Sequence, residues 1–441
     1  MKKIRTVYLL VILMLFGMTG CGEKSLLSAD DPVTLTMWHV YGEQADSPMN
    51  RLISEFNDTI GKEKGIIIDV TMVSNTSKIG NMLLESQADK PGAEEMPDLF
   101  FCHTNNADAL GVENMVDWNA CFTKEELSHF VEGFVLDGTI DGRLAVFPVS
   151  KSTYALYING TQFARFSEGT GVTYEDLSTW DGFFDAAEKY YEWSGGKTFC
   201  ALDYLIRHIE LDVLAKEGRL YDDNGWYDLE SGALKEAWMP FARALAQGHI
   251  AVSDLYANTQ IMTGETMTGI GSTAAILYFN DTVTYPDNTS EPTNLQVLPL
   301  PKTAGKPGLM PQTGVGLCAW QTTEQKAEAA SVFAHWLTES QRNLEFVVHT
   351  GYMPVNNGAF SEIDAYTFPS EAYANLYHAI KVMCEEYSAV VRPTYDAFYD
   401  RVDILYDGLR ERQGEYRLRS DSGEDAEAMA EEIWNFFCSI Q

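Results

Sequence analysis

The stretch VTLTMWHV (33–40) alternates apolar residues with threonines, and this period of two residues predicts a β-strand. In SPMNRLISEFND (47–58) the apolar residues have helical spacing instead. GIIIDVTMV (65–73) opens with a continuous apolar run, which is typical of a strand buried on both faces of a parallel sheet. A helix over 76–89 and a third strand within MPDLFFC (96–102) are expected to follow. These repeated units predict an α/β fold with a parallel sheet.

The pattern changes at DGRLAVFPVSKSTYALYING (141–160), where a proline interrupts an apolar stretch and a new strand, YALYIN, begins. Strands return with NLQVLPLP (294–301) and GVGLCAW (314–320), and the helix TTEQKAEAASVFAHWLTES (322–340) carries capping-box spacing at Thr322 and Gln325. Other helices are expected over 174–193, 201–217, 231–247, 272–281, 340–350, 369–386, 394–413 and 424–438.

This order predicts two discontinuous lobes, because strand-and-helix segments precede and follow a helical middle. A chain of 441 residues also exceeds a single hydrophobic core. We expect residues 32–147 plus 297–340 in one lobe and 148–296 plus 341–441 in the other. Two or three crossings between lobes form a hinge with an interdomain cleft, and ligands of α/β folds bind at strand ends in such a cleft.

The first twenty residues (1–20) have the pattern of a secretory signal peptide: a basic start, an apolar run, and small residues before Cys21. A cysteine there indicates a bacterial lipoprotein whose mature chain begins at an acylated Cys21, although Met18 replaces the usual leucine. A retained N-terminal anchor is the alternative. Residues 21–31 are expected to be a flexible tether. The rest of the chain is then extracellular, held at the cytoplasmic membrane by lipid.

The formal net charge of -33, from 31 Lys+Arg against 64 Asp+Glu, argues against nucleic acid and anionic lipid as partners. The eight histidines show no HExxH spacing, and the acidic segment 222–230 has no glycine at the position that an EF-hand calcium loop needs, so we expect no metal and no cofactor. Six further cysteines are expected as buried free thiols, with a Cys102–Cys121 bridge as the alternative; they are Cys102, Cys121, Cys200, Cys318, Cys384 and Cys438.

Aromatic and polar side chains follow the first strand. A sugar presents apolar C–H faces and a ring of hydroxyls, so its site needs aromatic planes together with fixed donors and acceptors. Trp38, His39 and Tyr41 supply both, and core packing is the alternative for Trp38. Tyr352, in a Gly-Tyr-Met-Pro turn, is a further candidate for the cleft. Arg392 precedes a proline at an expected loop–helix junction, where its guanidinium either binds phosphate, carboxylate or vicinal hydroxyls or forms a surface salt bridge.

Three further candidates are less specific. In TGIGSTAAI (268–276) two glycines precede an expected helix start at Ser272, where backbone amides bind polar oxygens; a simple helix cap is the alternative. His103, Asn105 and Asn106 follow the third strand and line the rim of the first lobe in this interpretation. Trp226 is either a second stacking platform or a surface aromatic.

Eight blocks in one order resemble a known family across essentially the whole mature chain: PVTLTMWHVYGE, GIIIDV, MPDLFF, GRLAVFPVSKSTYALYINGTQF, LSTWDGFFDAAEKY, MTGETMTGIGS, VLPLPKTAG and GYMPVNN. The family is that of extracellular solute-binding proteins of carbohydrate ABC importers. The resemblance implies a two-lobed periplasmic-binding-protein fold of type II, like that of maltose-binding protein.

Within that family the chain looks most like glycerol-3-phosphate binding proteins, by WH, TGYMPV and RPTYDAFYDRVD. That likeness departs in SNTSKIGNM, which offers Ser77 and Lys78 where those proteins hold a glycerol hydroxyl with an acid, so a different sugar or polyol also fits. The likeness implies ligand contacts at Ser152, Ser272, Gly314, Tyr352 and Arg392.

The resulting hypothesis is a non-catalytic, monomeric binding protein that closes on a carbohydrate or polyol and delivers it to the permease of an ABC importer. A secreted lipoprotein glycoside hydrolase is the alternative, but no motif singles out its carboxylate pair. A sensory protein that presents its ligand to a membrane receptor is a third possibility.

Overall fold

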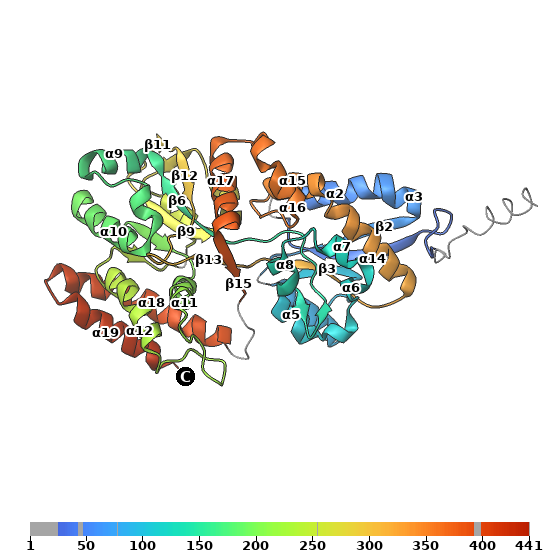
Figure 1. Cartoon of the computed structure of the whole chain (residues 1–441), viewed down its shortest axis with the longest axis horizontal. Helices are drawn as coiled ribbons and strands as arrows, with labels where there is room; N and C mark the ends of the chain where they lie inside the picture. Colours follow the sequence, from blue (N-terminus) through green and yellow to red (C-terminus); the bar gives the residue numbers. More distant parts are fainter. Residues whose placement is uncertain (1–24, 43–46, 77, 254, 392–397, 441) are drawn as a thin grey trace, which may run out of the picture.

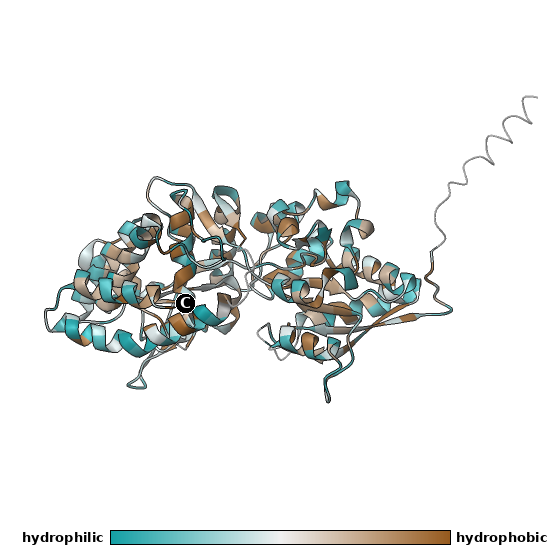
Figure 2. Ribbon diagram, turned by 90° about the horizontal axis from the view of Figure 1, so that it is seen from below, coloured by the Kyte–Doolittle hydropathy of each residue, from teal (hydrophilic) through white to brown (hydrophobic). Residues whose placement is uncertain are grey.

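The computed structural model describes residues 25–42, 47–76, 78–253, 255–391 and 398–440. The chain forms two lobes side by side along its longest axis, each built of a sheet covered by helices (Figure 1). Apolar residues concentrate on the strands and inner helix faces of both lobes (Figure 2). The buried apolar side chains form two clusters: one fills the first lobe and extends to Tyr157 and Val297 of the second sheet, and the other lies in the second lobe. The expected two-lobed α/β fold of type II is confirmed.

The first lobe contains a four-stranded sheet with the order β14-β3-β1-β2. β1 (Val33–His39) runs parallel to β2 (Ile66–Val73) and to β3 (Leu99–Cys102). β14 (Gly316–Ala319) is antiparallel to β3. All residues of β3 and β14 are buried, as their continuous apolar runs predict.

Helices cover this sheet. α2 (Pro48–Phe56) shows why they form locally, because the Ser47 side chain accepts from the Asn50 amide at its start and its apolar face is buried. The others are α3 (Lys62–Lys64), α4 (Ile79–Gln87), α5 (Thr104–Leu110), α6 (Trp118–Cys121), α7 (Lys124–Leu127), α8 (Glu132–Asp137), α14 (Glu324–Leu337), α15 (Ser340–Val348) and α16 (Asn357–Glu362), with a π-turn at Asn57–Gly61 and 3₁₀ turns at Val112–Asn114 and Ile363–Ala365.

The second lobe contains a five-stranded mixed sheet with the order β12-β6-β9-β7-β8. β6 (Tyr154–Asn159) is antiparallel to its neighbours β12 (Leu295–Leu298) and β9 (Thr268–Ser272). β7 (Cys200–Leu202) runs parallel to β9 and to β8 (Ile250–Ala251).

The helices of this lobe are α9 (Gly160–Thr170), α10 (Trp180–Ser194), α11 (Leu205–Ala215), α12 (Gly232–Ala246), α13 (Ala257–Met262), α17 (Glu371–Glu386), α18 (Phe398–Asp421) and α19 (Ala426–Cys438), with 3₁₀ turns at Glu175–Ser178 and Thr273–Tyr278. Three strand pairs complete the molecule: β4 (Thr139–Ile140) with β5 (Arg143–Leu144), β10 (Thr282–Thr284) with β11 (Ser290–Pro292), and β13 (Gly308–Pro311) with β15 (Tyr387–Val390).

Several local expectations were wrong. The helix expected over 201–217 begins only after β7, and the helix expected over 272–281 is the end of β9 followed by a 3₁₀ turn. The cap of α14 is Thr323, whose side chain accepts from the Lys326 amide, so the helix begins one residue later than expected and the expected capping box of Thr322 and Gln325 is not formed. In the first two cases an apolar run fits strand and helix equally well until its sheet neighbour is known.

The sheet pairing also differs from the expected division into lobes. Val297 lies in β12 and pairs with Tyr157 in the second sheet, although residues from 297 onward were expected in the first lobe. α15 and α16, expected in the second lobe, contribute buried residues to the core of the first. The other expected boundaries stay predictions.

The six cysteines that follow Cys21 in the sequence are free thiols, and three of them are buried. The Cys102–Cys121 bridge is not formed, because the partner beside Cys102 is Cys318 on the neighbouring strand, with 3.6 Å between the two sulfur atoms.

Candidate functional site

In both sheets, the strand ends on one side lie at the hinge, and we call each such side the hinge edge of its lobe. β1 and β3 end there in the first lobe, while in the second lobe β7 ends there and β6 begins with Tyr154 opposite Ser272. The crossing segments join the two edges, since Ser152 and Thr313 exchange backbone N–H···O bonds of 3.0 Å in both directions. Ligands of α/β folds bind beyond strand ends of this kind. These two edges are therefore the candidate ligand site.

His39 and Tyr41 lie at the edge of the first lobe, and both side chains are buried. His39 Nε2 is 2.8 Å from Asn50 Oδ1, and its Nδ1 accepts from the Tyr41 amide at 3.2 Å. The Tyr41 hydroxyl is 2.8 Å from Ser150 Oγ on the crossing chain. Burial lowers the pKa of His39 and raises that of Tyr41, so both groups are held neutral. They brace the loop after β1 against the hinge.

The two tryptophans proposed as stacking platforms lie in the cores. Trp38 is 2% exposed and its indole N–H donates to Thr71 Oγ1 at 3.1 Å. Trp226 is 5% exposed and packs against the rings of Tyr227 and Phe398. The structure thus favours the core alternative for Trp38, and Trp226 is neither a surface aromatic nor an accessible platform.

Asn106 lies on α5 and packs against Gly80 of α4. A Cβ placed on Gly80 would stand 2.3 Å from Asn106 Nδ2, so this contact needs the glycine. His103, directly before α5, does lie near the hinge, since its pKa is lowered by burial and by the neighbouring Lys151.

The crossing segments themselves contain predicted residues with structural roles. Ser152 is buried in the paired crossing. Gly314 has a φ of +107°, and a Cβ there would lie 3.3 Å from the Ser152 amide nitrogen, so the close approach favours glycine. Beside it, the buried Lys151 donates from Nζ to Asp137 Oδ2 at 2.6 Å and ties the crossing chain to α8. These residues set the geometry of the hinge.

Ser272 and Tyr352 are partly exposed at the same junction. The Ser272 hydroxyl accepts from the Ala274 amide at 3.2 Å, which supports the helix-cap alternative. The Tyr352 ring lies 5.8 Å from that of Tyr41. Arg392 and Cys21 lie outside the described residues.

The sequence analysis missed the aromatic and acidic side chains at the edge of the second lobe. Asp203 and Tyr204 directly follow β7, and Tyr256 comes between β8 and α13. Tyr204 is 52% exposed and Tyr256 67% exposed. The Asp203 carboxylate accepts from the Ala257 amide at 3.0 Å, which holds the two loops together. The Tyr204 ring stacks near Tyr154 at 6.1 Å.

A signal for these residues was present in the sequence. FCALDYL (199–205) contains a short apolar run followed by Asp203 and Tyr204, the order of a strand and its terminal loop. Because residues 201–217 were expected to be wholly helical, the short strand and the loop after it were not predicted. The exposed tyrosine with a left-handed backbone, φ +54° at Tyr204, becomes visible only in the structure.

Asp203 gives a testable pH dependence. Burial raises its pKa to about 7 from an ordinary value of 3.8. Between these values the folded state holds a proton that the unfolded state has lost, so stability falls as pH rises, by at most about 1.4 kcal/mol per pH unit. Asp203→Asn keeps the acceptor for Ala257 but cannot titrate. From pH 5 to pH 8, we expect the wild type to lose about 2–3 kcal/mol relative to this variant in urea unfolding. Parallel profiles would contradict the assignment.

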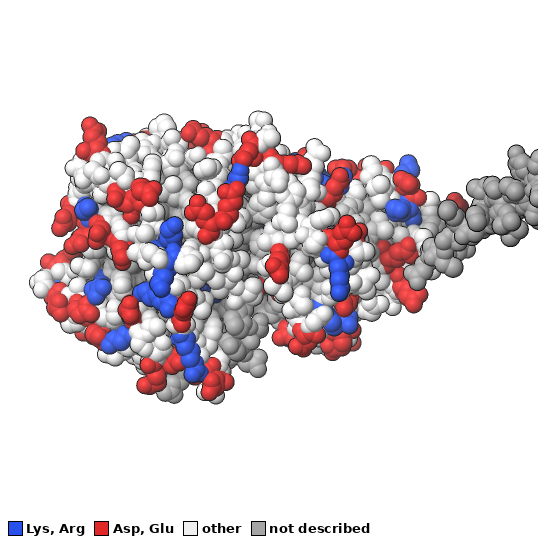
Figure 3. Space-filling model, in the orientation of Figure 1, with Lys and Arg blue, Asp and Glu red and all other residues white. Residues whose placement is uncertain are grey.

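In the described part of the chain no cluster of three His, Cys, Asp or Glu side chains is arranged to hold a metal ion. The same residues include no helix whose length and apolar character would let it span a bilayer. Acidic side chains are spread over both lobes on the face that Figure 3 shows.

The fold has close counterparts among solved structures. The cyclic alpha-maltosyl-1,6-maltose binding protein from Arthrobacter globiformis has 16% identity and a TM-score of 0.66, and the match covers 92% of this chain and 99% of that one. The sugar-binding protein MalE from Xanthomonas citri also has 16% identity and a TM-score of 0.66, covering 92% and 97%. UgpB from Mycobacterium tuberculosis, in complex with glycerophosphocholine, has 16% identity and a TM-score of 0.63, covering 92% and 98%. No curated protein matches the sequence.

Two α/β lobes joined by crossing strands, with accessible side chains at the hinge edges, define a two-lobed binding protein of type II. The model of the bacterial extracellular solute-binding proteins matches residues 52–371. The chain belongs to that family.

Proposed function

We propose that this protein binds an uncharged carbohydrate or polyol between its lobes and delivers it to the permease of an ABC importer when the hinge closes. In this proposal the protein acts as a monomer without catalysis, held at the outer face of the cytoplasmic membrane by lipid on Cys21. Binding would shift an open–closed equilibrium toward the form that the permease accepts.

The observation that carries the proposal is the edge of the second lobe. Exposed rings of Tyr204 and Tyr256 offer apolar planes for the C–H faces of a sugar. The carboxyl of Asp203, whose pKa is about 7, and the hydroxyl of Ser272 lie on the same edge as hydrogen-bonding groups for sugar hydroxyls. Tyr352 belongs to the opposite side in this arrangement.

The names of similar structures support a sugar ligand, since two of the three proteins compared above are described as binding maltose-type or other sugars. UgpB is described in complex with glycerophosphocholine, so the experiment must compare neutral sugars with a phosphate-bearing ligand.

Among the described residues, two cations close to the hinge are already paired, which supports an uncharged ligand over a phosphate. Lys151 on the crossing chain is already paired with Asp137. Arg207, near the end of β7, is buried and paired with Glu210. Neither side chain offers a free cation to a phosphate group. To bind phosphate, either would have to leave its carboxylate partner, and a buried carboxylate without its partner destabilises the fold.

A thermal-shift screen of the full-length protein tests this function. Maltose, maltotriose, raffinose, sorbitol and glycerol-3-phosphate are compared at equal concentration, because a ligand of the folded state alone raises Tm by mass action. We expect stabilisation by at least one neutral compound, about 2.7 kcal/mol at a hundred times Kd. Stabilisation by glycerol-3-phosphate alone would contradict the neutral-ligand assignment, and release of smaller sugars from the trisaccharides would contradict the binding role.

A further inference from the structure

The residues directly before β1 are held on the first lobe by side chains of α14. Glu328 accepts from the Ser25 hydroxyl at 2.6 Å and from the Leu26 amide at 2.8 Å. Gln325, one turn earlier on the same helix, donates from Nε2 to the Leu26 carbonyl oxygen at 3.2 Å. Both main-chain polar groups of Leu26 are therefore bound by α14. We call these three hydrogen bonds the N-terminal clasp.

Further contacts continue the attachment from the clasp to β1. The Leu27 side chain packs against the buried cluster that fills the first lobe. Ser28 lies directly on Gly65, where a Cβ would collide with the Ser28 carbonyl oxygen. Gly65 has a φ of +74°, which also favours glycine, and its carbonyl oxygen accepts from the Val33 amide at 2.9 Å. Residues 25–31, which belong to the expected tether, thus lie on the first lobe.

The clasp limits how far the first lobe can stand from Cys21. Only the three residues 22–24 separate Cys21 from Ser25. Four residue steps of about 3.3–3.6 Å each span no more than about 14 Å between the two Cα atoms. If the chain were free up to Val33, twelve such steps would allow about 40 Å. The clasp and the contacts that follow it therefore remove about two-thirds of the possible reach.

The clasp also lies at one end of the molecule. Figure 1 shows α3 at the end of the first lobe that points away from the hinge, and α9 toward the opposite end, in the second lobe. Gly65, on which the segment rests, directly follows α3. A lipid carried by Cys21, within about 14 Å of Ser25, is therefore confined to the neighbourhood of α3 and α14.

We propose that the N-terminal clasp makes this end of the first lobe the surface that faces the membrane. The proposal rests on the lipid on Cys21 in the function proposed above. With the lipid inserted in the bilayer, α3 stays close to the phospholipid headgroups. Hinge closure then moves the second lobe toward a first lobe that is held at the membrane.

Fluorescence energy transfer to the bilayer measures which end faces it. The full-length lipidated protein carries a fluorescent non-canonical residue at Glu63 on α3 or, in a second preparation, at Glu168 on α9; both side chains are exposed. The protein is bound to phosphatidylcholine vesicles that contain a lipid with an acceptor dye on its headgroup. We expect at least twofold more transfer from position 63 than from position 168. Equal transfer, or more transfer from position 168, would overturn the proposal.

Two variants separate the clasp from the length of the tether. Glu328→Ala keeps a good helix former in α14 but removes the acceptor, so the Leu26 amide should exchange its hydrogen at least tenfold faster. The difference in transfer between the two positions should then shrink. An insertion of about twelve glycine and serine residues after Gly22 adds roughly 20 Å of reach. It should shrink the difference while Leu26 exchange stays slow; unchanged transfer with this longer tether would contradict the proposal.

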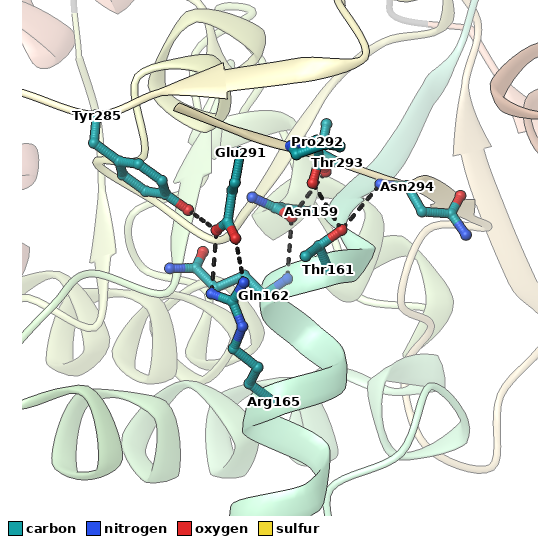
Figure 4. A network of polar contacts seen from close by, with 9 residues as sticks. All are labelled: Asn159, Thr161, Gln162, Arg165, Tyr285, Glu291, Pro292, Thr293 and Asn294. Atoms are coloured by element: carbon teal, nitrogen blue, oxygen red, sulfur yellow. Dashed lines mark hydrogen bonds and ion pairs between the residues drawn. The ribbon is translucent and has the colours of Figure 1, made fainter. Parts of the chain in front are cut away.

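Glu291→Gln is the matched control, because this carboxylate also joins a chain segment to a helix. It accepts from Arg165 of α9, with 3.1 Å between Nη1 and Oε1, and from the Tyr285 hydroxyl. Figure 4 shows these side chains converging from α9 and the β10–β11 hairpin of the second lobe. Because the network is far from the N-terminal clasp, neither Leu26 exchange nor energy transfer should change. A change as large as that in Glu328→Ala would contradict the role of the clasp.

Mass spectrometry of the same preparation tests the lipid separately. A protein without acyl groups on Cys21 would contradict the anchoring proposed above and the orientation that rests on it. A lipidated protein whose two labelled positions transfer equally would overturn the orientation alone.

Discussion

Replacing Asp137 by asparagine is expected to lower the free energy of unfolding by about 3–5 kcal/mol. Lys151 Nζ is wholly buried and lies 2.6 Å from the Asp137 carboxylate, which is itself only 14% exposed. Removing the negative charge leaves an ammonium group in the interior without compensation, and such a group costs more than the pair contributes. Urea unfolding at pH 7 measures the loss.

A control variant and a rescue variant test whether the unpaired buried lysine causes this loss of stability. Glu85→Gln removes the carboxylate of the Lys90–Glu85 pair, whose side chains are 50–60% exposed, and should change stability by less than about 1 kcal/mol. Adding Lys151→Met to Asp137→Asn should recover part of the loss, because the uncompensated charge is then gone. Equal effects of the Asp137 and Glu85 substitutions would show that burial of the lysine is not the cause.

Tyr204→Gly is expected to weaken sugar binding at least tenfold while leaving the fold as stable as before. The side chain is half-exposed at the hinge edge, so its removal eliminates a stacking plane and little buried area. Aromatic residues of this kind dominate many binding sites, at about 2 kcal/mol or more each. The φ of +54° is strained for tyrosine but natural for glycine, which offsets the lost packing on Tyr154 and Tyr406.

Calorimetric titration with the best sugar from the thermal-shift screen measures this effect. Tyr256→Ala should weaken binding similarly, and the double variant should leave no measurable affinity at the hinge. Tyr174→Ala is the control, because that exposed tyrosine stacks on Phe163 on α9, away from the hinge edge. If Tyr204→Gly bound as tightly as the wild type, the edge of the second lobe could not be the sugar-contacting surface.

The candidate site could be predicted only in part. The sequence located His39 and Tyr41 at the end of a strand, because a strand that stops in a loop is visible from local spacing. It singled out Ser272 at an expected helix start and Tyr352 in a turn. Whether a side chain at such a place faces a ligand or a core depends on residues far away in sequence. The indole of Trp38 is covered through the pairing of β1 with β2, which local spacing does not reveal.

The sequence by itself determined the repeated strands and helices of an α/β protein and its acidic composition. These properties depend on periodicity and composition within short windows. Only the tertiary structure decided that β12 pairs with β6, that Lys151 is neutralised by Asp137, and that Asp203 and Tyr204 reach the hinge edge. Each of these involves segments brought together by burial and hydrogen bonding across the fold, and the free energy of such contacts is not encoded in any one segment.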